Sequence, residues 1–429
     1  MSPKPFVRYA VVTFGCRVNQ ADSLRIEEDL LGRGAVASTA ADADLVIVNT
    51  CSVTATADQG ARQTIRRISR DNPSARIVVT GCYATRAAAD VAVLPNVVRV
   101  VANPDKLALV DDWFASSSEL TTAERFAGAD GPCGAPIAPG FAGRTAFTLR
   151  VQTGCEERCA YCIIPTTRGY GRSLPIRAVV REVERIAAAG FREVAITGVH
   201  LGSYGRDLTP AASLLDLLRA LDASPADVTY RVSSLEPMDC SPEIVSLVAG
   251  SGGRFAPHFH LPLQHASDPL LARMRRPYTL SEYRRLVDGI VDRLPHASIG
   301  SDLIVGFPGE SEEDFAANEA YLPSSPLSHL HVFPYSDRPG TEASTMGGRV
   351  TPTAIRVRGA RLRQIGAALA QRFRAAQVGT VRPGLTLEDG TLVVTDNYLK
   401  VRVPAGRARN ERVSVRIDEA DGVVTGTIA

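Results

Sequence analysis

Six cysteines in this sequence fall into two groups of three whose settings suit metal binding. In the stretch VQTGCEERCAYCIIP, one group has the spacing Cys-x3-Cys-x2-Cys, at Cys155, Cys159 and Cys162. Gly154 precedes this group, and a glycine leaves the backbone free to wrap around a bound group. Three thiolates can each hold one iron of a 4Fe-4S cube and leave the fourth iron open to an exogenous ligand. The spacing therefore predicts an iron-sulfur site with one catalytic iron.

Two other uses of this motif fit the sequence less well. Structural zinc takes four protein ligands, and no fourth ligand is evident nearby. Three buried thiols could also pack along one face of a helix. The charged residues Glu156 and Arg158 between the cysteines, and Pro165 after them, disfavour such a helix. Iron-sulfur binding remains the favoured interpretation.

The other three cysteines, Cys16, Cys51 and Cys82, lie far apart in the sequence but in matching settings. Each follows an apolar run with β character, in VVTFGC, VIVNTC and IVVTGC. The carboxyl ends of neighbouring parallel strands lie along one edge of a sheet, where ligands collect, so the three thiols should converge. One such cysteine would usually be a buried structural thiol. Three at equivalent positions predict a second cluster with three protein ligands and one free iron.

The composition is that of a globular protein with reduced thiols. The 429 residues are 45% hydrophobic and 22% charged, and eight cysteines are too few for a disulfide scaffold. No apolar run approaches the roughly 20 residues of a membrane helix, and the start of the chain lacks a signal-peptide pattern. We therefore expect a cytoplasmic protein with no membrane partner. Cys133 and Cys240 lie in unlike settings and are expected to be unligated thiols.

Strand and helix patterns divide the chain into four predicted parts. Residues 1–115 alternate apolar strands with helical stretches, which is typical of a parallel α/β domain. Residues 116–144 are rich in Gly, Pro, Ala and Ser and are expected to be a linker. Residues 145–375 contain six strands, each ahead of a helical stretch, and predict a central open (β/α)6 partial barrel. Residues 376–429 alternate short strands with Gly turns and predict a small carboxy-terminal all-β barrel.

Some helix boundaries can also be predicted. The first helix of the amino-terminal part is expected from about Ser23 to Leu31. Ser173 and Pro175 are expected to open the first helix of the barrel. Ser311, followed by three acidic residues, predicts another helix start.

Together these segments resemble the methylthiotransferases of the radical S-adenosylmethionine (radical SAM) superfamily. The cysteine motif, with Tyr161 before its last cysteine, looks like the superfamily's cluster motif. The segments TFGCRVNQADS, VNTCSVTATAD and VTGCYA resemble the amino-terminal methylthiotransferase domain. Similar to the barrel segments are ITGVHLGSYG, RVSSLEP, HLPLQHASDPLLARMRRPYT, DLIVGFPGESEEDF and HVFPYSDRPGT. Residues from about 376 match the position of the TRAM domain, a small RNA-binding barrel. The likeness covers nearly the whole chain.

Within that family, the substrate differs between branches. The sequence Val18-Asn19-Gln20 and the segment from His200 to Gly205 are similar to the MtaB-like branch, which modifies threonylcarbamoyladenosine next to the tRNA anticodon. A second branch acts on isopentenyladenosine, and a third modifies an aspartate of a ribosomal protein. A different class of protein would keep both clusters without catalysis, as an iron-sulfur RNA-binding or electron-transfer protein. We expect the MtaB-like activity.

The resemblance implies two 4Fe-4S clusters and S-adenosylmethionine as cofactors. S-adenosylmethionine would bind the open iron at Cys155, Cys159 and Cys162, and one electron would split it into methionine and a 5′-deoxyadenosyl radical. That radical would take the hydrogen from carbon 2 of adenine, which no protein base removes at neutral pH. A methylthio group borne on the second cluster would couple there, its sulfur methylated by a second S-adenosylmethionine. A reducing electron donor and a sulfur donor are therefore implied partners, and the two groups of thiols should face one cavity.

The resemblance also suggests contacts for S-adenosylmethionine. The backbone around Thr197 and Gly198, at the end of a barrel strand, would suit the methionine amino group. Ser234 and Glu236, after the third barrel strand, are candidates for ribose or amine contacts. Gly198 could instead form only a turn, and Glu236 could be only a surface carboxylate. No catalytic side chain is expected, because the cofactors make and break the bonds.

Two arginine-rich stretches suggest where the tRNA anticodon stem-loop would bind. Residues 349–374 contain seven Arg and no Asp or Glu, and residues 400–416 contain six basic residues and only Glu411. Such patches suit phosphate contacts, and Tyr398 beside the second one could stack on a base. The first stretch could instead be the solvated face of a helix.

Five histidines cluster near two barrel strands in the sequence. His258 and His260 should lie on the same face of their strand, since side chains alternate along a strand. That spacing could bind a metal ion, or it could provide polar lining and ordinary packing. The same alternatives hold for His265 and for the pair His329 and His331.

Overall fold

Strands and helices alternate along most of the chain, as the sequence predicts. The structure is a computed structural model, and it describes residues 7–117 and 137–429. It contains two compact units, Met1–Ile137 with Ile163–Tyr170, and Ala138–Cys162 with Gly171–Ala429. Each is described by itself below. The four-part division of the chain stays a prediction, and Cys133 and much of the predicted linker lie outside the described residues.

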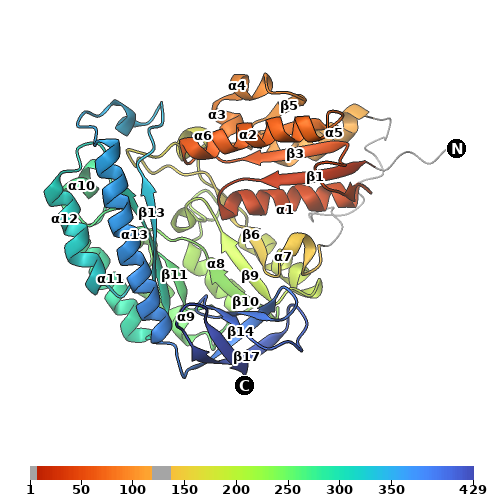
Figure 1. The fold of residues 1–429 in the computed structure, drawn as a ribbon. Helices are drawn as coiled ribbons and strands as arrows, with labels where there is room; N and C mark the ends of the chain where they lie inside the picture. Colours follow the sequence, from red (N-terminus) through yellow and green to blue (C-terminus); the bar gives the residue numbers. More distant parts are fainter. Residues whose placement is uncertain (1–6, 118–136) are drawn as a thin grey trace. The chain divides into compact units, whose positions relative to one another are not determined.

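A parallel sheet in the order β2-β1-β3-β4-β5 forms the centre of the first unit (Figure 1). Its strands are β1 (Arg8–Thr13), β2 (Val36–Ala37), β3 (Leu45–Thr50), β4 (Arg76–Gly81) and β5 (Val97–Val101). Its helices are α1 (Arg17–Gly32), α2 (Ala55–Asp71), α3 (Cys82–Arg86), α4 (Ala88–Ala92), α5 (Leu109–Ser117) and α6 (Ile164–Arg168). A 3-10 helix, η1, spans Asn103–Ala108.

Helices cover both faces of this sheet. Val46 and Val48 of β3 share a core with Ile65 of α2, whereas Leu45 and Ile47 share another with helix α1. Neighbouring residues of β3 thus face opposite helices, as the alternation of side chains along a strand requires. Because β3 is buried on both faces, its sequence is an uninterrupted apolar run.

Helix α1 begins six residues earlier than predicted, at Arg17 rather than Ser23. Val18, Ala21 and Leu24 are buried, so packing extends the helix up to its N-cap residue, Cys16. Short β2 and the half-exposed β5, which the sequence pattern did not predict, complete the sheet.

Six parallel strands in the second unit confirm the predicted open (β/α)6 partial barrel. They are β6 (Phe147–Arg150), β9 (Glu193–Thr197), β10 (Thr229–Val232), β11 (His258–His260), β12 (Ser298–Val305) and β13 (His329–Pro334). They form two sheets, β10-β9-β6 and β11-β12-β13. A parallel bridge between Tyr230 and Phe255, and a hydrogen bond from the Leu235 N–H to the His260 carbonyl (3.0 Å), link the two sheets.

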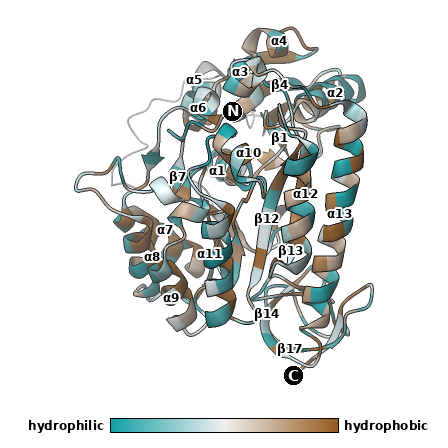
Figure 2. Ribbon diagram, turned by 90° about the vertical axis from the view of Figure 1, so that its left-hand side faces the viewer, coloured by the Kyte–Doolittle hydropathy of each residue, from teal (hydrophilic) through white to brown (hydrophobic). Residues whose placement is uncertain are grey.

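Helices of mixed hydropathy lie outside these strands, and α7, α8, α9 and α11 lie side by side (Figure 2). The helices are α7 (Ile176–Ala188), α8 (Leu214–Asp222), α9 (Pro242–Gly250), α10 (Asp268–Arg273), α11 (Leu280–Arg293), α12 (Glu312–Tyr321) and α13 (Pro352–Ala375). Ser311 is the N-cap of α12, as predicted, and it also forms a capping box with Asp314. Pro175 is the N-cap of α7, but Ser173 belongs to strand β8 (Arg172–Ser173), paired with β7 (Gln152–Thr153).

A closed barrel of order β14-β15-β16-β18-β17 ends the chain and confirms the predicted carboxy-terminal all-β barrel. Its strands are β14 (Val381–Leu387), β15 (Leu392–Thr395), β16 (Lys400–Arg402), β17 (Arg412–Glu419) and β18 (Thr425–Ile428). Val393, Val401, Val415 and Ile417 are fully buried inside it. Across the described parts of the chain, no helix is both long enough and apolar enough to span a membrane.

The buried centre of this barrel predicts a local stability effect. Replacement Ile417→Ala should lower the free energy of unfolding by about 2–5 kcal/mol, because it leaves a cavity in a closed core. Native-state hydrogen exchange of the β14–β18 amides should accelerate accordingly. Val423→Ala is the matched control, since Val423 is 63% exposed. Equal exchange rates in the two variants would contradict this assignment of the core.

Candidate functional site

Three cysteines of the first unit lie at the carboxyl ends of adjacent strands. Cys16 follows the loop after β1, Cys51 directly follows β3, and Cys82 directly follows β4 as the first residue of α3. Strands β1, β3 and β4 are neighbours in the sheet. The three residues therefore stand at one edge of the sheet, and the convergence of their thiols on one metal site stays a prediction.

Two glycines bring the three cysteine-bearing loops into direct contact. A Cβ atom on Gly15 would overlap the Cβ and Sγ atoms of Cys51, and one on Gly81 would overlap the backbone of Thr50. Both glycines also have positive φ angles, of 89° and 99°, which L side chains rarely adopt. Only glycine at these two positions permits the loops to pack this closely.

The environment of these thiols differs within the group. Cys51 and Cys82 are buried and Cys16 is exposed. The pKa of Cys51 is raised to about 11, mainly by burial of the thiol and to a smaller extent by Cys16 and Cys82. The Val53 backbone N–H and Arg168 act in the opposite direction and lower this pKa. A metal ligand must be a thiolate, so occupation of the site by metal has to displace this proton.

A buried polar network lies beside the three thiols. Arg168 of α6 donates from Nη2 to Asn19 Oδ1 (2.5 Å) and to Asp22 Oδ2 (3.2 Å). Lys106 Nζ donates to the same Asp22 oxygen (2.9 Å) and to Asn49 Oδ1 (3.1 Å). The side chains of Arg168, Lys106 and Asp22 are at most 2% exposed. The sequence analysis did not identify this network, because its members come from distant segments.

The second trio, Cys155, Cys159 and Cys162, lies on one loop after β6 and β7, and all three residues are partly exposed. Gly154 has a positive φ of 78°, and its carbonyl accepts a hydrogen bond from Gln152 Nε2 (2.8 Å). The loop is anchored further along by the Ala160 N–H, which donates to the Met274 carbonyl (3.0 Å). The sequence motif thus folds into a fixed loop with three reachable thiols.

A buried arginine contacts this trio as well. The Arg276 Nη1 atom lies 3.1 Å from Cys159 Sγ, and its side chain is 1% exposed. Its guanidinium pairs with the Glu236 carboxylate and lies over the Tyr278 ring. Burial opposes the charge, but Tyr161, Tyr278 and Cys159 outweigh it and keep the pKa of Arg276 above its usual range.

His200 is a further buried residue beside the second trio. Its Nε2 atom lies 2.8 Å from Asp239 Oδ2, and its backbone N–H donates to Gln152 Oε1 (2.9 Å). Burial would lower the pKa of His200, but hydrogen bonds with Asp239 and Cys155 outweigh burial and raise it to about 9. The segment HLGSYG contained the signal for this residue, although only as part of a family resemblance.

The four residues predicted to contact S-adenosylmethionine lie at the ends of β9 and β10. Thr197 is buried, and its carbonyl accepts from the Val151 N–H (2.9 Å). Gly198 packs so tightly that an added Cβ would lie 2.7 Å from Leu201 and 3.1 Å from Gln152. Ser234 is exposed, and Glu236 is linked to Cys159 through Arg276. Their role toward a cofactor stays a prediction.

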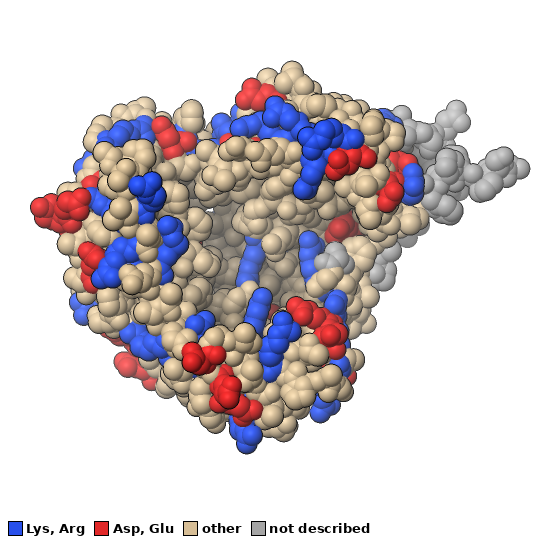
Figure 3. All heavy atoms as spheres, in the orientation of Figure 1, with Lys and Arg blue, Asp and Glu red and all other residues tan. Residues whose placement is uncertain are grey.

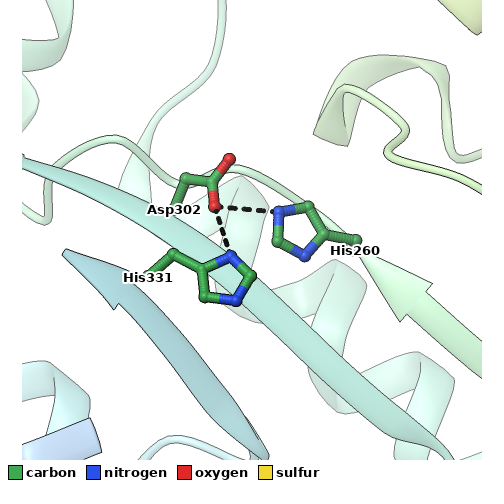
Figure 4. A group of neighbouring side chains, drawn as sticks. All are labelled: His260, Asp302 and His331. Carbon is green, nitrogen blue, oxygen red and sulfur yellow. Dashed lines mark hydrogen bonds and ion pairs between the residues drawn. The ribbon is translucent and has the colours of Figure 1, made fainter. Parts of the chain in front are cut away.

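Histidines line one face of the β11-β12-β13 sheet. His260 and His331 both hydrogen-bond to Oδ1 of Asp302, at 2.9 and 3.2 Å, so that this carboxylate lies between the two rings (Figure 4). Burial opposes ionisation of Asp302, but the two histidines outweigh it and hold its pKa well below its usual range. His258 instead stacks on Tyr398, with ring centroids 4.5 Å apart. These contacts give the side chains partners within the protein.

Acidic groups elsewhere in the fold neutralise part of the predicted basic surface. Arg358 is buried against Glu310 and Glu312, and Arg361 pairs with Glu319 at 2.7 Å. On the face seen in Figure 3, acidic side chains are interspersed with basic ones around the region of β14 and β17. The first arginine-rich stretch is therefore less positive than its sequence alone suggested.

Two family models match the chain. The model described as "Uncharacterized protein family UPF0004" matches residues 8–103, and the model described as "Radical SAM superfamily" matches residues 149–320. Among solved structures, the radical S-adenosylmethionine methyltransferase TsrM from Kitasatospora setae with cobalamin and a [4Fe-4S] cluster bound is similar in fold. Its TM-score is 0.54 at 18% identity, over 79% of this chain and 77% of that chain.

Curated relatives match over nearly the full length. Threonylcarbamoyladenosine tRNA methylthiotransferase MtaB of Aquifex aeolicus is 35% identical over 400 residues, 92% of this chain and 96% of the relative. The MtaB protein of Bacillus subtilis is 34% identical over 91% of this chain and 88% of the relative. The tRNA-2-methylthio-N(6)-dimethylallyladenosine synthase of Sphingopyxis alaskensis is 34% identical over 98% of this chain and 96% of the relative.

The contact between His200 and Asp239 predicts a pH effect on the metal-free protein. Because the folded-state pKa of His200 is raised to about 9, the pair should stabilise the fold fully below the unfolded-state value of about 6.5 and lose this contribution as pH rises through about 9. Asp239→Asn should lower the pKa of His200, measured by NMR titration of selectively labelled histidine. Asp421→Asn, an exposed change in the carboxy-terminal barrel, is the control. An unchanged His200 titration in Asp239→Asn would contradict the assignment.

Proposed function

Because the chain belongs to the methylthiotransferase family of the radical SAM superfamily, we propose that it methylthiolates carbon 2 of N6-threonylcarbamoyladenosine at tRNA position 37, next to the anticodon. The enzyme is a transferase of the MtaB type. The observation that carries the proposal is the pair of cysteine trios, one at the ends of neighbouring strands of the first unit and one on a single loop of the second. Two such sites suit a reaction that must both form a radical and deliver sulfur.

The residues present fit two iron-sulfur clusters with three protein ligands each. The first would be held by Cys16, Cys51 and Cys82, whose loops touch through Gly15 and Gly81. The second would be held by the thiols of the Cys155–Cys162 loop, of which Cys159 contacts Arg276. Three sulfur ligands in each group are the donor set that iron-sulfur clusters take. The cationic groups near each trio offset the negative charge of three thiolates.

S-adenosylmethionine would bind at the ends of β9 and β10, beside the second trio. Thr197 and Gly198 would meet the methionine amino group with their backbone, and Ser234 and Glu236 would meet the ribose or the amine. When bound, the cluster and S-adenosylmethionine supply radical chemistry, which the bond between carbon 2 of adenine and its hydrogen requires because no side chain is a strong enough base. The chain itself would hold these groups in place.

The proposed substrate is the anticodon stem-loop of tRNA, whose loop bases are already partly unstacked. Arg356 and Arg363 of α13, and Lys400 and Arg402 of β16, are exposed and would contact phosphates. Tyr398 has its ring against His258 and near Arg231, and base stacking by Tyr398 stays a prediction. A reducing electron donor and a sulfur donor would be the other partners, in the cytoplasm.

The residues that suggested the MtaB-like branch support the two cysteine sites. Asn19 donates through Nδ2 to the Phe14 and Thr50 carbonyls, both at 2.9 Å, and so ties the loops of Cys16 and Cys51 together. His200 contacts the second trio through Cys155. Asn19 and His200 would therefore influence the choice of substrate only indirectly. Methylthiolation of isopentenyladenosine is the competing activity, and a relative of 34% identity supports it.

Metal analysis tests the cluster assignment. After anaerobic reconstitution the chain should bind about eight irons, and about four when the three cysteines of either trio are replaced by alanine. Cys240→Ala is the matched control, because it removes a buried thiol outside both trios. Retention of about eight irons by a trio variant, or loss of iron in Cys240→Ala, would contradict the assignment.

Nucleoside mass spectrometry tests the substrate. A host that lacks this tRNA modification should gain 2-methylthio-threonylcarbamoyladenosine when it expresses the chain, and should not gain it with Cys159→Ala. Methylthiolated isopentenyladenosine in its place would assign the competing activity. Purified enzyme with S-adenosylmethionine and reductant should also release 5′-deoxyadenosine, and its absence would favour a non-catalytic iron-sulfur protein.

A further inference from the structure

Three neighbouring strands of the partial barrel bring side chains with metal-binding chemistry to one face of their sheet. Gly300 of β12 is in register with His260 of β11, and Asp302 of β12 is in register with His331 of β13. Gly300 and Asp302 lie on the same face, because side chains alternate along a strand. His260, Asp302 and His331 each offer one ligand atom, and these three atoms lie within 4.8 Å of one another. The histidine spacing in the sequence allowed a metal site here, but it did not identify the carboxylate.

We propose that His260, Asp302 and His331 bind a divalent transition-metal ion such as zinc, with a water molecule as a further ligand. Two imidazoles and one carboxylate are a donor set that zinc and iron(II) take at sites with an open coordination position. The inference goes beyond the proposed methylthiotransferase activity and does not depend on it, since none of the three residues belongs to either cysteine trio.

The distances between the donor atoms suit one shared ion. The Asp302 Oδ1 atom lies 2.9 Å from His260 Nε2 and 3.2 Å from His331 Nδ1, between the two rings (Figure 4). Two donors that are each about 2.1 Å from an ion lie about 3.0–3.4 Å apart when they meet it at an angle of about 90–110°. The hydrogen-bonded arrangement is therefore already close to the geometry that a bound ion would impose.

Gly300 leaves the space in which these rings lie. A Cβ atom at this position would come within 2.9 Å of His260 Nδ1 and would overlap the His329 ring. A side chain there would thus displace His260 from Asp302. His329 lies beside the group and is not part of it, and its Nδ1 atom is 3.0 Å from Ser328 Oγ. Because the three donors stand on paired strands, their positions are fixed more precisely than those of donors on loops.

One side of the group is open to solvent. The side chains of His260 and Asp302 are 11% and 26% exposed, whereas that of His331 is 56% exposed. An ion can therefore reach the group, and a water molecule can complete its coordination. A structural zinc site would instead be closed by a fourth protein ligand. The group has the character of an open site, at which an exogenous oxygen ligand can replace the water.

Zinc content and zinc X-ray absorption test this site in the full-length chain. The anaerobically reconstituted protein, equilibrated with chelator-buffered Zn²⁺, should bind one zinc ion. The nearest neighbours of this zinc should be nitrogen and oxygen at about 2.0–2.1 Å, with no sulfur at about 2.3 Å. A chain in which the six cysteines of both trios are replaced by alanine should give the same result, so the test also holds if the cluster assignment fails.

Variants of the most exposed ligand, made in the six-alanine chain, test its identity. His331→Ala should weaken zinc binding about 100-fold or more, since changes outside the coordination shell already cost about 10–100-fold. His296→Ala is the matched control, because it removes an exposed histidine of the same unit that lies outside the group. His331→Cys retains a ligand at this position and should add one sulfur neighbour at about 2.3 Å to the zinc spectrum.

Four results would overturn the proposal. They are the absence of bound zinc in both unsubstituted forms, sulfur neighbours of zinc in the six-alanine chain, equal zinc affinity of His331→Ala and His296→Ala, and no sulfur neighbour in His331→Cys. The first two need no substitution within the group, so they decide the case even if a variant does not fold. All four are read without S-adenosylmethionine or tRNA, and failure of the proposed activity is read separately from tRNA nucleosides.

Discussion

The close packing of loops at the carboxyl edge of the first sheet is the constraint on which the amino-terminal site depends. Parallel strands lie about 4.8 Å apart, so loops that leave neighbouring strands must pass within van der Waals contact. Gly15 against Cys51, and Gly81 against Thr50, satisfy this requirement without side chains. The loops that carry Cys16, Cys51 and Cys82 are thereby packed closely by backbone geometry. A site built in this way needs no local Cys-x-x-Cys motif.

Charge compensation is the second requirement that both cysteine trios meet. Each has a buried arginine beside it, Arg168 in the first unit and Arg276 in the second, and each arginine is paired with a carboxylate, Asp22 or Glu236. A buried cation without a partner would be costly, whereas a paired and hydrogen-bonded one is tolerated. The carboxylates therefore permit the arginines to remain charged next to the sulfurs. The repetition in two unrelated folds indicates a shared physical need.

The sequence predicted those features that depend on local pattern. The six barrel strands, the closed carboxy-terminal barrel and the strand-end positions of Cys16, Cys51 and Cys82 follow from alternation, turn residues and apolar runs. Features made by distant segments could not be predicted in this way. The place of Arg168 in the first unit depends on how α6 packs, and no periodicity encodes that contact.

Local composition also misleads where the fold supplies counterions. The stretch 349–374 contains no acidic residue, yet Glu310, Glu312 and Glu319 lie against Arg358 and Arg361. Those acidic groups are in α12 and the turn before it, some forty residues earlier in the chain. Helix α1 shows the same limitation at a boundary, because tertiary burial of Val18 extends it beyond its predicted start. Helix propensity and charge counts describe one segment at a time. The charge of a folded surface and the exact start of a helix also depend on contacts with other segments.

Tertiary contacts also fix the position of the proposed RNA-binding barrel relative to the strands of the partial barrel. Arg231 of β10, paired with Glu193 at 3.0 Å, donates to the carbonyls of Thr395 (3.3 Å) and Asp396 (2.9 Å) in the carboxy-terminal barrel. Asn397 Nδ2 donates to the His296 carbonyl (2.9 Å). Because these bonds are largely buried and involve backbone groups, they fix the small barrel on the strands of the partial barrel. RNA held by the small barrel would thus be held at a defined place relative to β10, so that affinity for the stem-loop would also orient the target base.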